Sequence, residues 1–163
     1  MTEKFRENVA IIVCNSEGKV LLCARADQKG YDWQFPQGGI DFGESVLDAA
    51  CRELREETGI RDVTLVAKMP EGVKYYFPRA IAARFKNSGN VGQNQHYVLF
   101  RLNNDNVKID FETHPEEIEF KAYKWAELED APREIVYFKK EAYQKAADYF
   151  RPYIEQIKKA KAG

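Results

Sequence analysis

The chain has 163 residues, of which 44% are apolar and 31% are charged, and its formal net charge is -1. This composition is typical of a globular domain and excludes a disordered chain, and the near-neutral charge excludes a uniformly basic surface for nucleic acid. No apolar run approaches the roughly twenty residues that span a bilayer, and the charged N-terminal residues are unlike a signal peptide.

The three cysteines are widely spaced along the chain and lie in apolar segments. Cys14, Cys23 and Cys51 are an odd number, and no C-x-x-C pair is present. This usage favours buried free thiols over disulfides or a thiolate metal site. The sequence therefore predicts one cytoplasmic domain over residues 1–163, without a linker or an internal repeat.

The first half of the chain predicts two strands, a short extended segment and one helix. Apolar runs at residues 9–14 and 20–24 predict strands joined by a glycine-containing hairpin loop. Residues 33–36 are expected to be extended, because a proline favours the β region for the residue before it. A helix is expected to begin near Ser45 and to end at Gly59, since these residue types cap helix termini.

The second half predicts further strands, at residues 63–68, 73–77, 80–84 and 97–102. Residues 88–95 are rich in glycine and amides and predict a loop. Residues 118–125 predict another strand, and a helical turn is expected near residues 127–130. Residues 133–161 predict an amphipathic helix that Pro152 should kink or end.

Three carboxylates are concentrated on one face of the helix predicted after Ser45. Glu53, Glu56 and Glu57 fall within roughly 100° of arc at 3.6 residues per turn. Like charges at this spacing repel, so a helix under no other demand gains nothing from them. A neighbouring stripe is expected to face the core, and it consists of Leu47, Ala50, Cys51, Leu54 and Thr58. Clustered carboxylates are the ligands that Mg²⁺ and Mn²⁺ prefer, so the face predicts a metal site.

The residues around this helix form a longer motif. Gly38, Glu44 and residues 52–60 fit the spacing G-x5-E-x7-R-E-U-x-E-E-x-G-U, where U is a bulky aliphatic residue. This pattern resembles the Nudix box and matches it at every fixed position. The resemblance implies an α/β fold, an α/β/α sandwich around a mixed β-sheet. It also implies a hydrolase that cleaves a nucleoside diphosphate linked to another moiety.

The resemblance also assigns roles within the box. Glu53, Glu56 and Glu57 would bind Mg²⁺ or Mn²⁺, with more than one ion, and the Gly38 carbonyl would be a further metal ligand. Arg52 would orient the carboxylates, and Glu44 would pair within the loop and helix. The general base is left open between Glu56 and Glu119.

Several segments outside the box resemble one subgroup of the family, the bacterial RNA 5′-pyrophosphohydrolases and the diadenosine tetraphosphate hydrolases. These segments are residues 5–9, 33–39, 74–78, 92–95, 119–120 and 136–140. By this match Glu119 would be a fourth metal-binding and catalytic carboxylate. The same match assigns phosphate and base binding to Arg6, Arg25, Lys74, Tyr75, Gln95, Phe138 and Lys139. Two residues depart from the subgroup, Glu7 and Tyr76.

Three functions are compatible with these residues. The first is metal-dependent removal of pyrophosphate from the 5′-triphosphate end of RNA, which leaves a 5′-monophosphate and promotes RNA decay. The second is hydrolysis of dinucleoside polyphosphates at the same metal site. The third is a nucleotide-binding Nudix module without catalysis, although such a module is expected to have lost box carboxylates. No membrane and no stable protein partner are implied. Phe138 has core packing as an equal alternative, and Lys139 a solvated surface.

Overall fold

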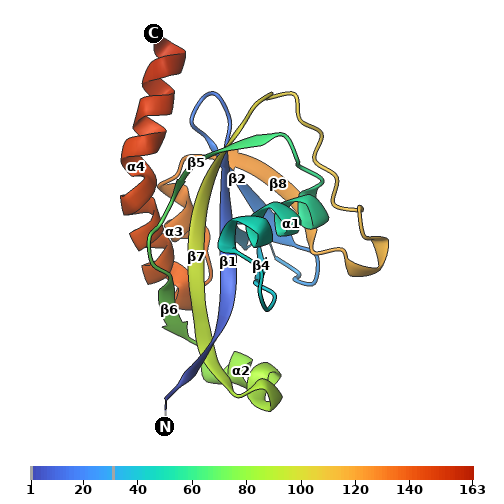
Figure 1. Ribbon diagram of the computed structural model, residues 1–163. Helices are drawn as coiled ribbons and strands as arrows, with labels where there is room; N and C mark the ends of the chain where they lie inside the picture. Colours follow the sequence, from blue (N-terminus) through green and yellow to red (C-terminus); the bar gives the residue numbers. More distant parts are fainter. Residues whose placement is uncertain (1, 31) are drawn as a thin grey trace.

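Two long parallel strands form the centre of the molecule, in a computed structural model that describes residues 2–30 and 32–163 (Figure 1). β1 (Lys4–Cys14) and β7 (Asn90–Leu102) pair in parallel, with Val9 opposite His96 and Ile11 opposite Val98. Residues 9–14 of β1 are buried on both faces of the sheet, as their continuous apolar run predicts.

The remaining strands of the mixed sheet extend on both sides of this pair. The order of the main path is β3-β2-β1-β7-β5, while β4 pairs with β1, β6 with β7 and β8 with β2. These strands are β2 (Val20–Arg25), β3 (Trp33–Gln34), β4 (Gln37–Gly39), β5 (Val63–Lys68), β6 (Val73–Tyr76) and β8 (Phe120–Ala126).

Helices cover the two faces of this sheet (Figure 1). α1 (Val46–Thr58) buries Leu54 on one face, in a core cluster that also contains Ile11. α3 (Asp130–Glu134) and α4 (Lys140–Ala162) cover the other face, where Phe150 and Ile12 share a second core cluster. Each large apolar side chain buried in this way contributes about 1.5–3 kcal/mol. The α/β/α sandwich around a mixed sheet is therefore confirmed.

The predicted caps of α1 are also confirmed. The Ser45 hydroxyl oxygen accepts a hydrogen bond from the Asp48 backbone N–H at 3.1 Å, and Gly59 adopts a left-handed φ of 77°. The prediction that all three cysteines are buried is wrong for Cys51, which is exposed at the edge of the helix, although all three thiols are free. Cys51 therefore does not belong to the core stripe of α1.

Two predictions in the middle of the chain are wrong. The strand expected at residues 80–84 is helical, in α2 (Arg79–Ala82) and the 3₁₀ helix η1 (Ala83–Ser88). Proline before an alanine- and arginine-rich segment favours this helical start. The loop expected at residues 88–95 is mostly strand, because β7 begins at Asn90 and finds backbone partners in both β1 and β6.

The C-terminal region consists of several helical segments. α3 ends at Glu134, Ile135 is extended, and the 3₁₀ helix η3 (Tyr137–Lys139) precedes α4. The single helix predicted for residues 133–161 is therefore wrong at its start. Pro152 lies inside α4 and does not end it.

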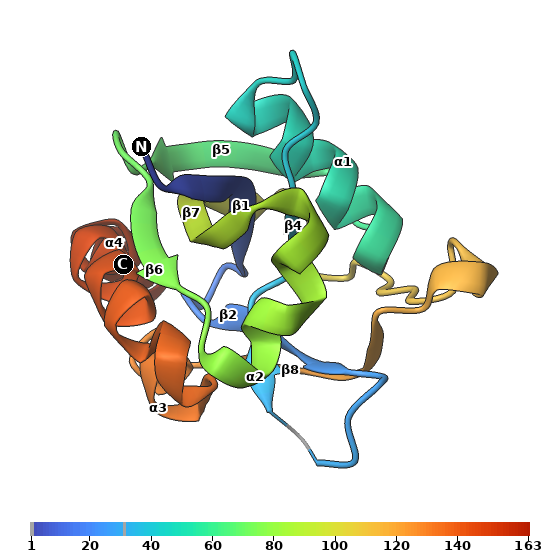
Figure 2. The same cartoon turned by 90° about the horizontal axis from the view of Figure 1, so that it is seen from below.

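The segment between β7 and β8 contains one further 3₁₀ helix, η2 (Pro115–Glu117). In the part of the chain that the structure describes, no helix is long and apolar enough to cross a membrane. α2 and η1 lie at the same end of the sheet as the N-terminus (Figure 1), and the view from that end shows them in front of the sheet (Figure 2).

Candidate active site

A cleft of about 320 Å³ lies where α1 faces β4 and the segment that leads into β8. α1 contributes Glu53, Glu56 and Glu57, and Glu119 precedes β8. The cleft is lined by Arg6, Arg25, Gln37, Gly38, Gly39, Glu53, Glu56, Glu57, His114, Glu117 and Glu119. The structure therefore brings together all five predicted metal-binding positions, although they come from three separate segments of the chain.

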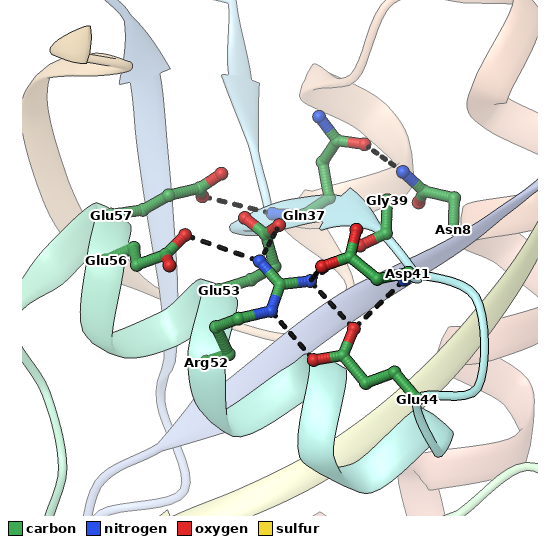
Figure 3. A network of polar contacts seen from close by, with 9 residues as sticks. All are labelled: Asn8, Gln37, Gly39, Asp41, Glu44, Arg52, Glu53, Glu56 and Glu57. Atoms are coloured by element: carbon green, nitrogen blue, oxygen red, sulfur yellow. Dashed lines mark hydrogen bonds and ion pairs between the residues drawn. The ribbon is translucent and has the colours of Figure 1, made fainter.

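Arg52 connects the glycine loop to the carboxylates of α1 (Figure 3). Its guanidinium donates to both oxygens of Glu44 at 2.8 and 2.9 Å, to Glu53 Oε1 at 2.8 Å and to the Gly39 carbonyl at 3.0 Å. A longer contact of 3.4 Å reaches Glu56. The Arg52 hydrogen bonds lower the pKa of Glu44 to about 2, so Glu44 remains ionised. This network agrees with the orienting role proposed for Arg52 and the structural role proposed for Glu44.

Glu57 is the most buried carboxylate of the cleft, with 8% of its surface exposed. Burial raises its pKa well above the usual value, and the charges of Glu53 and Glu119 raise it further. Burial likewise raises the pKa of Glu53. The cleft therefore concentrates negative charge that its own cations do not balance, which is the condition that a bound cation relieves.

The donor set fits a hard divalent cation. Among the described residues, no three acidic, histidine or cysteine side chains are close enough to hold an ion in the present rotamers. Arg52 occupies one oxygen each of Glu53 and Glu56. The Glu56 and Glu119 side chains are 33% and 42% exposed and have room to rotate. Carboxylates with a backbone carbonyl are oxygen-only ligands, so Mg²⁺ or Mn²⁺ is favoured over a soft metal.

Gly38 leaves the space that the Glu53 carboxylate occupies, because a Cβ built on Gly38 would overlap that carboxylate. We expect Gly38→Ala to displace the Glu53 carboxylate and to lower kcat/KM by about 10–100-fold, as a misplaced functional group does. Steady-state kinetics on purified protein tests this. Gly30→Ala is the matched control, since its added methyl would meet no atom within 4 Å. Equal activity of both variants would contradict the role of Gly38.

A second cavity, of about 250 Å³, adjoins the carboxylate cleft. Its cations are Arg6, Arg25, Arg84 and Lys139, against a single acidic residue in its lining, Asp32. The other lining residues are Gln28, Gln34, Gln37, Phe77, Ile81, Phe85, Gln93, Ile135, Val136 and Phe138. The rings of Phe77 and Phe85 stack with centroids 4.2 Å apart. A cationic cavity with aromatic walls suits a polyanion that carries a base.

Lys139 shows the charge imbalance of this cavity. Burial lowers the pKa of its ammonium to about 8, and repulsion from Arg25 and Arg6 adds to the effect. Within residues 2–30 and 32–163, no carboxylate forms an ion pair with Lys139. A bound anion would restore the ordinary pKa of this group.

The predicted substrate-binding residues are not all in this cavity. Arg6, Arg25, Phe138 and Lys139 line it. Tyr75 does not line the cavity, but its ring centroid lies 5.9 Å from that of the lining residue Phe138.

Lys74 and Gln95 line neither cavity. Lys74 has its ammonium 5.2 Å from the ring centroid of Phe5, because adjacent strand residues face opposite sides of the sheet. Gln95 is fully buried in the sheet. We do not propose direct substrate contacts for these two residues.

Several lining residues were not predicted from the sequence. Gln93 accepts a hydrogen bond from Arg6 at 2.8 Å, although its amide-rich segment predicted a loop. Arg84 and Phe85 belong to η1, in the segment expected to contain a strand. The proline before Arg79 was the available signal for a helical segment at this position.

The family model for the NUDIX domain matches residues 4–146. The chain is a member of the Nudix family. Divalent metals are general in Nudix hydrolases, which agrees with the carboxylate cleft.

Curated relatives match this Nudix chain over nearly its whole length. The RNA pyrophosphohydrolase of Erythrobacter litoralis is 38% identical, over 93% of each chain. That of Bartonella henselae is 39% identical, over 92% of each chain. That of Helicobacter pylori is 39% identical, over 91% of this chain and 95% of the relative.

Solved structures share the fold at lower identity. The E. coli dihydroneopterin triphosphate pyrophosphohydrolase has a TM-score of 0.68 at 21% identity, covering 89% of this chain and 97% of that chain. A C. elegans Ap4A hydrolase in a binary complex has a TM-score of 0.62 at 22% identity, covering 90% and 98%. These structures support the Nudix fold alone.

Proposed function

We propose that this Nudix domain removes pyrophosphate from the 5′-triphosphate end of RNA and leaves a 5′-monophosphate. The relatives named RNA pyrophosphohydrolase, at 38–39% identity, support this substrate. The cofactor we propose is Mg²⁺ or Mn²⁺, with more than one ion bound. We also propose that residues 1–163 form a single domain, of which the family model covers 4–146.

The observation that carries this proposal is the position of two arginines. Arg6 and Arg25 line both the carboxylate cleft and the cationic cavity. A triphosphate can therefore contact the metal-binding side and the cations at once. The 5′ nucleoside would lie against the aromatic wall, where Phe138 can stack on a base. A chain of phosphates with one attached nucleotide matches this arrangement better than an isolated phosphate does.

The residues of the carboxylate cleft would have two roles in this hydrolysis, metal binding and proton acceptance. Water attacks the α- or the β-phosphorus of the triphosphate, the P–O bond of the anhydride between these two phosphates breaks, and pyrophosphate leaves while the RNA keeps the α-phosphate. Bound divalent cations would neutralise phosphoryl charge and lower the pKa of the attacking water. Glu53 and Glu57 would hold these cations, with the Gly38 carbonyl. Either Glu56 or Glu119 would accept the proton of the water.

Metal removal is the first test of this proposal. With chelator present, we expect 5′-triphosphorylated RNA to remain unchanged, and added Mg²⁺ or Mn²⁺ should restore conversion to 5′-monophosphorylated RNA and pyrophosphate. Separation of the RNA products by gel and enzymatic detection of pyrophosphate measure this. Full activity in chelator would contradict metal dependence, and an unchanged 5′ end with metal would contradict the substrate.

A second candidate function is hydrolysis of dinucleoside polyphosphates. The aromatic residues of the cationic cavity, Phe77, Phe85 and Phe138, offer a surface on which one adenosine of such a molecule can stack. The non-catalytic module has less support, because the box carboxylates Glu53, Glu56 and Glu57 are all present.

We propose a cytoplasmic location for this activity. Cys14, Cys23 and Cys51 are all free thiols, as is usual in a reducing compartment.

A further inference from the structure

A chain of buried polar side chains ends at the junction of the two cavities. The Tyr97 hydroxyl donates to Gln95 Oε1, and Gln95 Nε2 donates to Asn8 Oδ1 at 2.7 Å. Asn8 Nδ2 then donates to Gln37 Oε1 at 2.8 Å. Tyr97, Gln95 and Asn8 have no exposed surface. Water therefore cannot satisfy these groups, and each must be satisfied inside the protein.

Every hydrogen bond in this series, from Tyr97 through Gln95 and Asn8 to Gln37, is donated toward Gln37. Each amide accepts at its oxygen and donates from its nitrogen, so the last amide has its oxygen occupied by Asn8. Figure 3 shows the Gln37 side chain with its oxygen toward Asn8 and its nitrogen pointing away from it. In the part of the chain that the structure describes, no acceptor binds this nitrogen. This series of hydrogen bonds therefore leaves both N–H groups of the Gln37 amide available as donors.

Gln37 lies where such donors can meet an anion. It lines both the carboxylate cleft and the cationic cavity, as do Arg6 and Arg25. Its backbone N–H donates to Glu57 Oε2 at 3.3 Å, which fixes the residue beside the carboxylates. If the amides were all reversed, the Gln37 carbonyl oxygen would face the phosphates instead, and an acceptor facing an anion is unfavourable.

We propose that the Gln37 amide nitrogen donates a hydrogen bond to a phosphate oxygen of the substrate at the junction of the two cavities. Tyr97, Gln95 and Asn8 are positioning residues that keep this donor directed outward. The inference rests on the proposed function and adds a polyphosphate contact that depends on no charged side chain. It also gives Gln95 a positioning role, with Asn8 and Gln37 between it and the substrate, in place of the direct contact expected from the sequence.

Gln37→Met keeps the length of the side chain and removes the donor. Hydrogen bonds to charged groups contribute about 1.5–3 kcal/mol, so we expect KM for 5′-triphosphorylated RNA to rise by about 10–100-fold. The melting temperature should fall, because the buried Asn8 Nδ2 loses its acceptor, so KM is measured well below the midpoint of unfolding. Gln144→Met is the matched control, since Gln144 is exposed on α4 and its amide nitrogen donates to Asp148, on the same exposed helix face. An unchanged KM in Gln37→Met would overturn the proposal.

Asn8→Asp tests the positioning chain. Aspartate accepts from Gln95 but cannot donate to Gln37, so Gln37 should turn its nitrogen inward and present its oxygen to the substrate. We expect a rise in KM similar to that of Gln37→Met, and no further rise when the two changes are combined. Independent, multiplying effects would overturn the positioning role of Asn8. If Asn8→Asp does not fold, Tyr97→Phe supplies the same comparison, with a smaller rise expected alone and none in the Gln37→Met background.

The failure of this inference is distinguishable from failure of the proposed function. If the wild-type protein does not convert triphosphorylated RNA, the RNA substrate is wrong. The contact is then judged by calorimetric titration of wild type and Gln37→Met with tripolyphosphate and Mg²⁺. Weaker binding to the variant, by about tenfold or more, would support the Gln37 contact. Equal binding would overturn it.

Discussion

Glu57→Gln is expected to lower kcat/KM for 5′-triphosphorylated RNA by about 10²–10³-fold, which corresponds to a loss of about 3–4 kcal/mol of transition-state stabilisation. The substitution keeps the shape of the side chain and removes one negative charge from the cleft. Metal affinity should fall as well, so part of the activity should return at high Mg²⁺ concentration. Kinetics over a range of Mg²⁺ concentrations measures both effects.

The same substitution should stabilise the metal-free protein. Burial, together with Glu53 and Glu119, raises the pKa of Glu57, so its ionised form destabilises the folded state at neutral and higher pH. Glutamine removes this cost. In chelator we expect a higher Tm for Glu57→Gln than for wild type, and saturating Mg²⁺ should reduce or reverse the difference.

Glu116→Gln is the matched control, because Glu116 is exposed on η2 and does not line the cleft. Its activity and its response to Mg²⁺ should equal those of wild type. A Glu57→Gln protein with wild-type kinetics would contradict metal binding by this carboxylate. A Glu57→Gln protein that loses activity because it has unfolded in both chelator and Mg²⁺ would contradict the account of charge repulsion in the cleft.

Lys139→Met should weaken substrate binding while stabilising the free protein. Loss of a charge-assisted contact to phosphate is expected to raise KM by about 10–100-fold. Without substrate, the ammonium is destabilised by burial and by Arg25 and Arg6. Methionine keeps the apolar part of the side chain and removes this charge, so the Tm of the free variant should exceed that of wild type at neutral pH.

The pH dependence of stability gives an independent measure of the Lys139 charge. Its pKa falls from the model-compound value to about 8 in the folded protein, so folding favours the neutral amine. Stability of the free wild-type protein should therefore be lower below pH 8 and rise as the pH increases above it, up to the unfolded pKa. This component should be absent in Lys139→Met. If stability rises by the same amount above pH 8 in wild type and in Lys139→Met, the rise comes from another titratable group and the account of Lys139 is contradicted.

The α1 region could be predicted from the sequence because its determinants are local. Ser45 and Gly59 cap the helix, and the spacing of Glu53, Glu56 and Glu57 places them on one face without help from distant residues. The motif therefore predicted both an element and its chemistry. The apolar runs of β1 and β2 were equally informative, since continuous hydrophobicity indicates strands buried on both faces.

The walls of the cationic cavity could not be predicted in the same way. Gln93 lies in a segment expected to be a loop, and only the pairing of β7 with β1 and β6 makes this segment a strand. The Gln37 donor of β4 depends on side chains from two other strands, Asn8 of β1 and the pair Gln95 and Tyr97 of β7. Such contacts between distant segments carry no periodicity in the sequence.

We expect the protein to prefer an RNA 5′ end over a dinucleoside polyphosphate. The most direct measurement supplies 5′-triphosphorylated RNA and diadenosine tetraphosphate at equal concentrations in one Mg²⁺-containing reaction and follows both products over time. The ratio of initial rates equals the ratio of kcat/KM values. We expect 5′-monophosphorylated RNA and pyrophosphate to form at least about tenfold faster than ATP and AMP, a discrimination of about 1.4 kcal/mol. Faster cleavage of diadenosine tetraphosphate would contradict the claim.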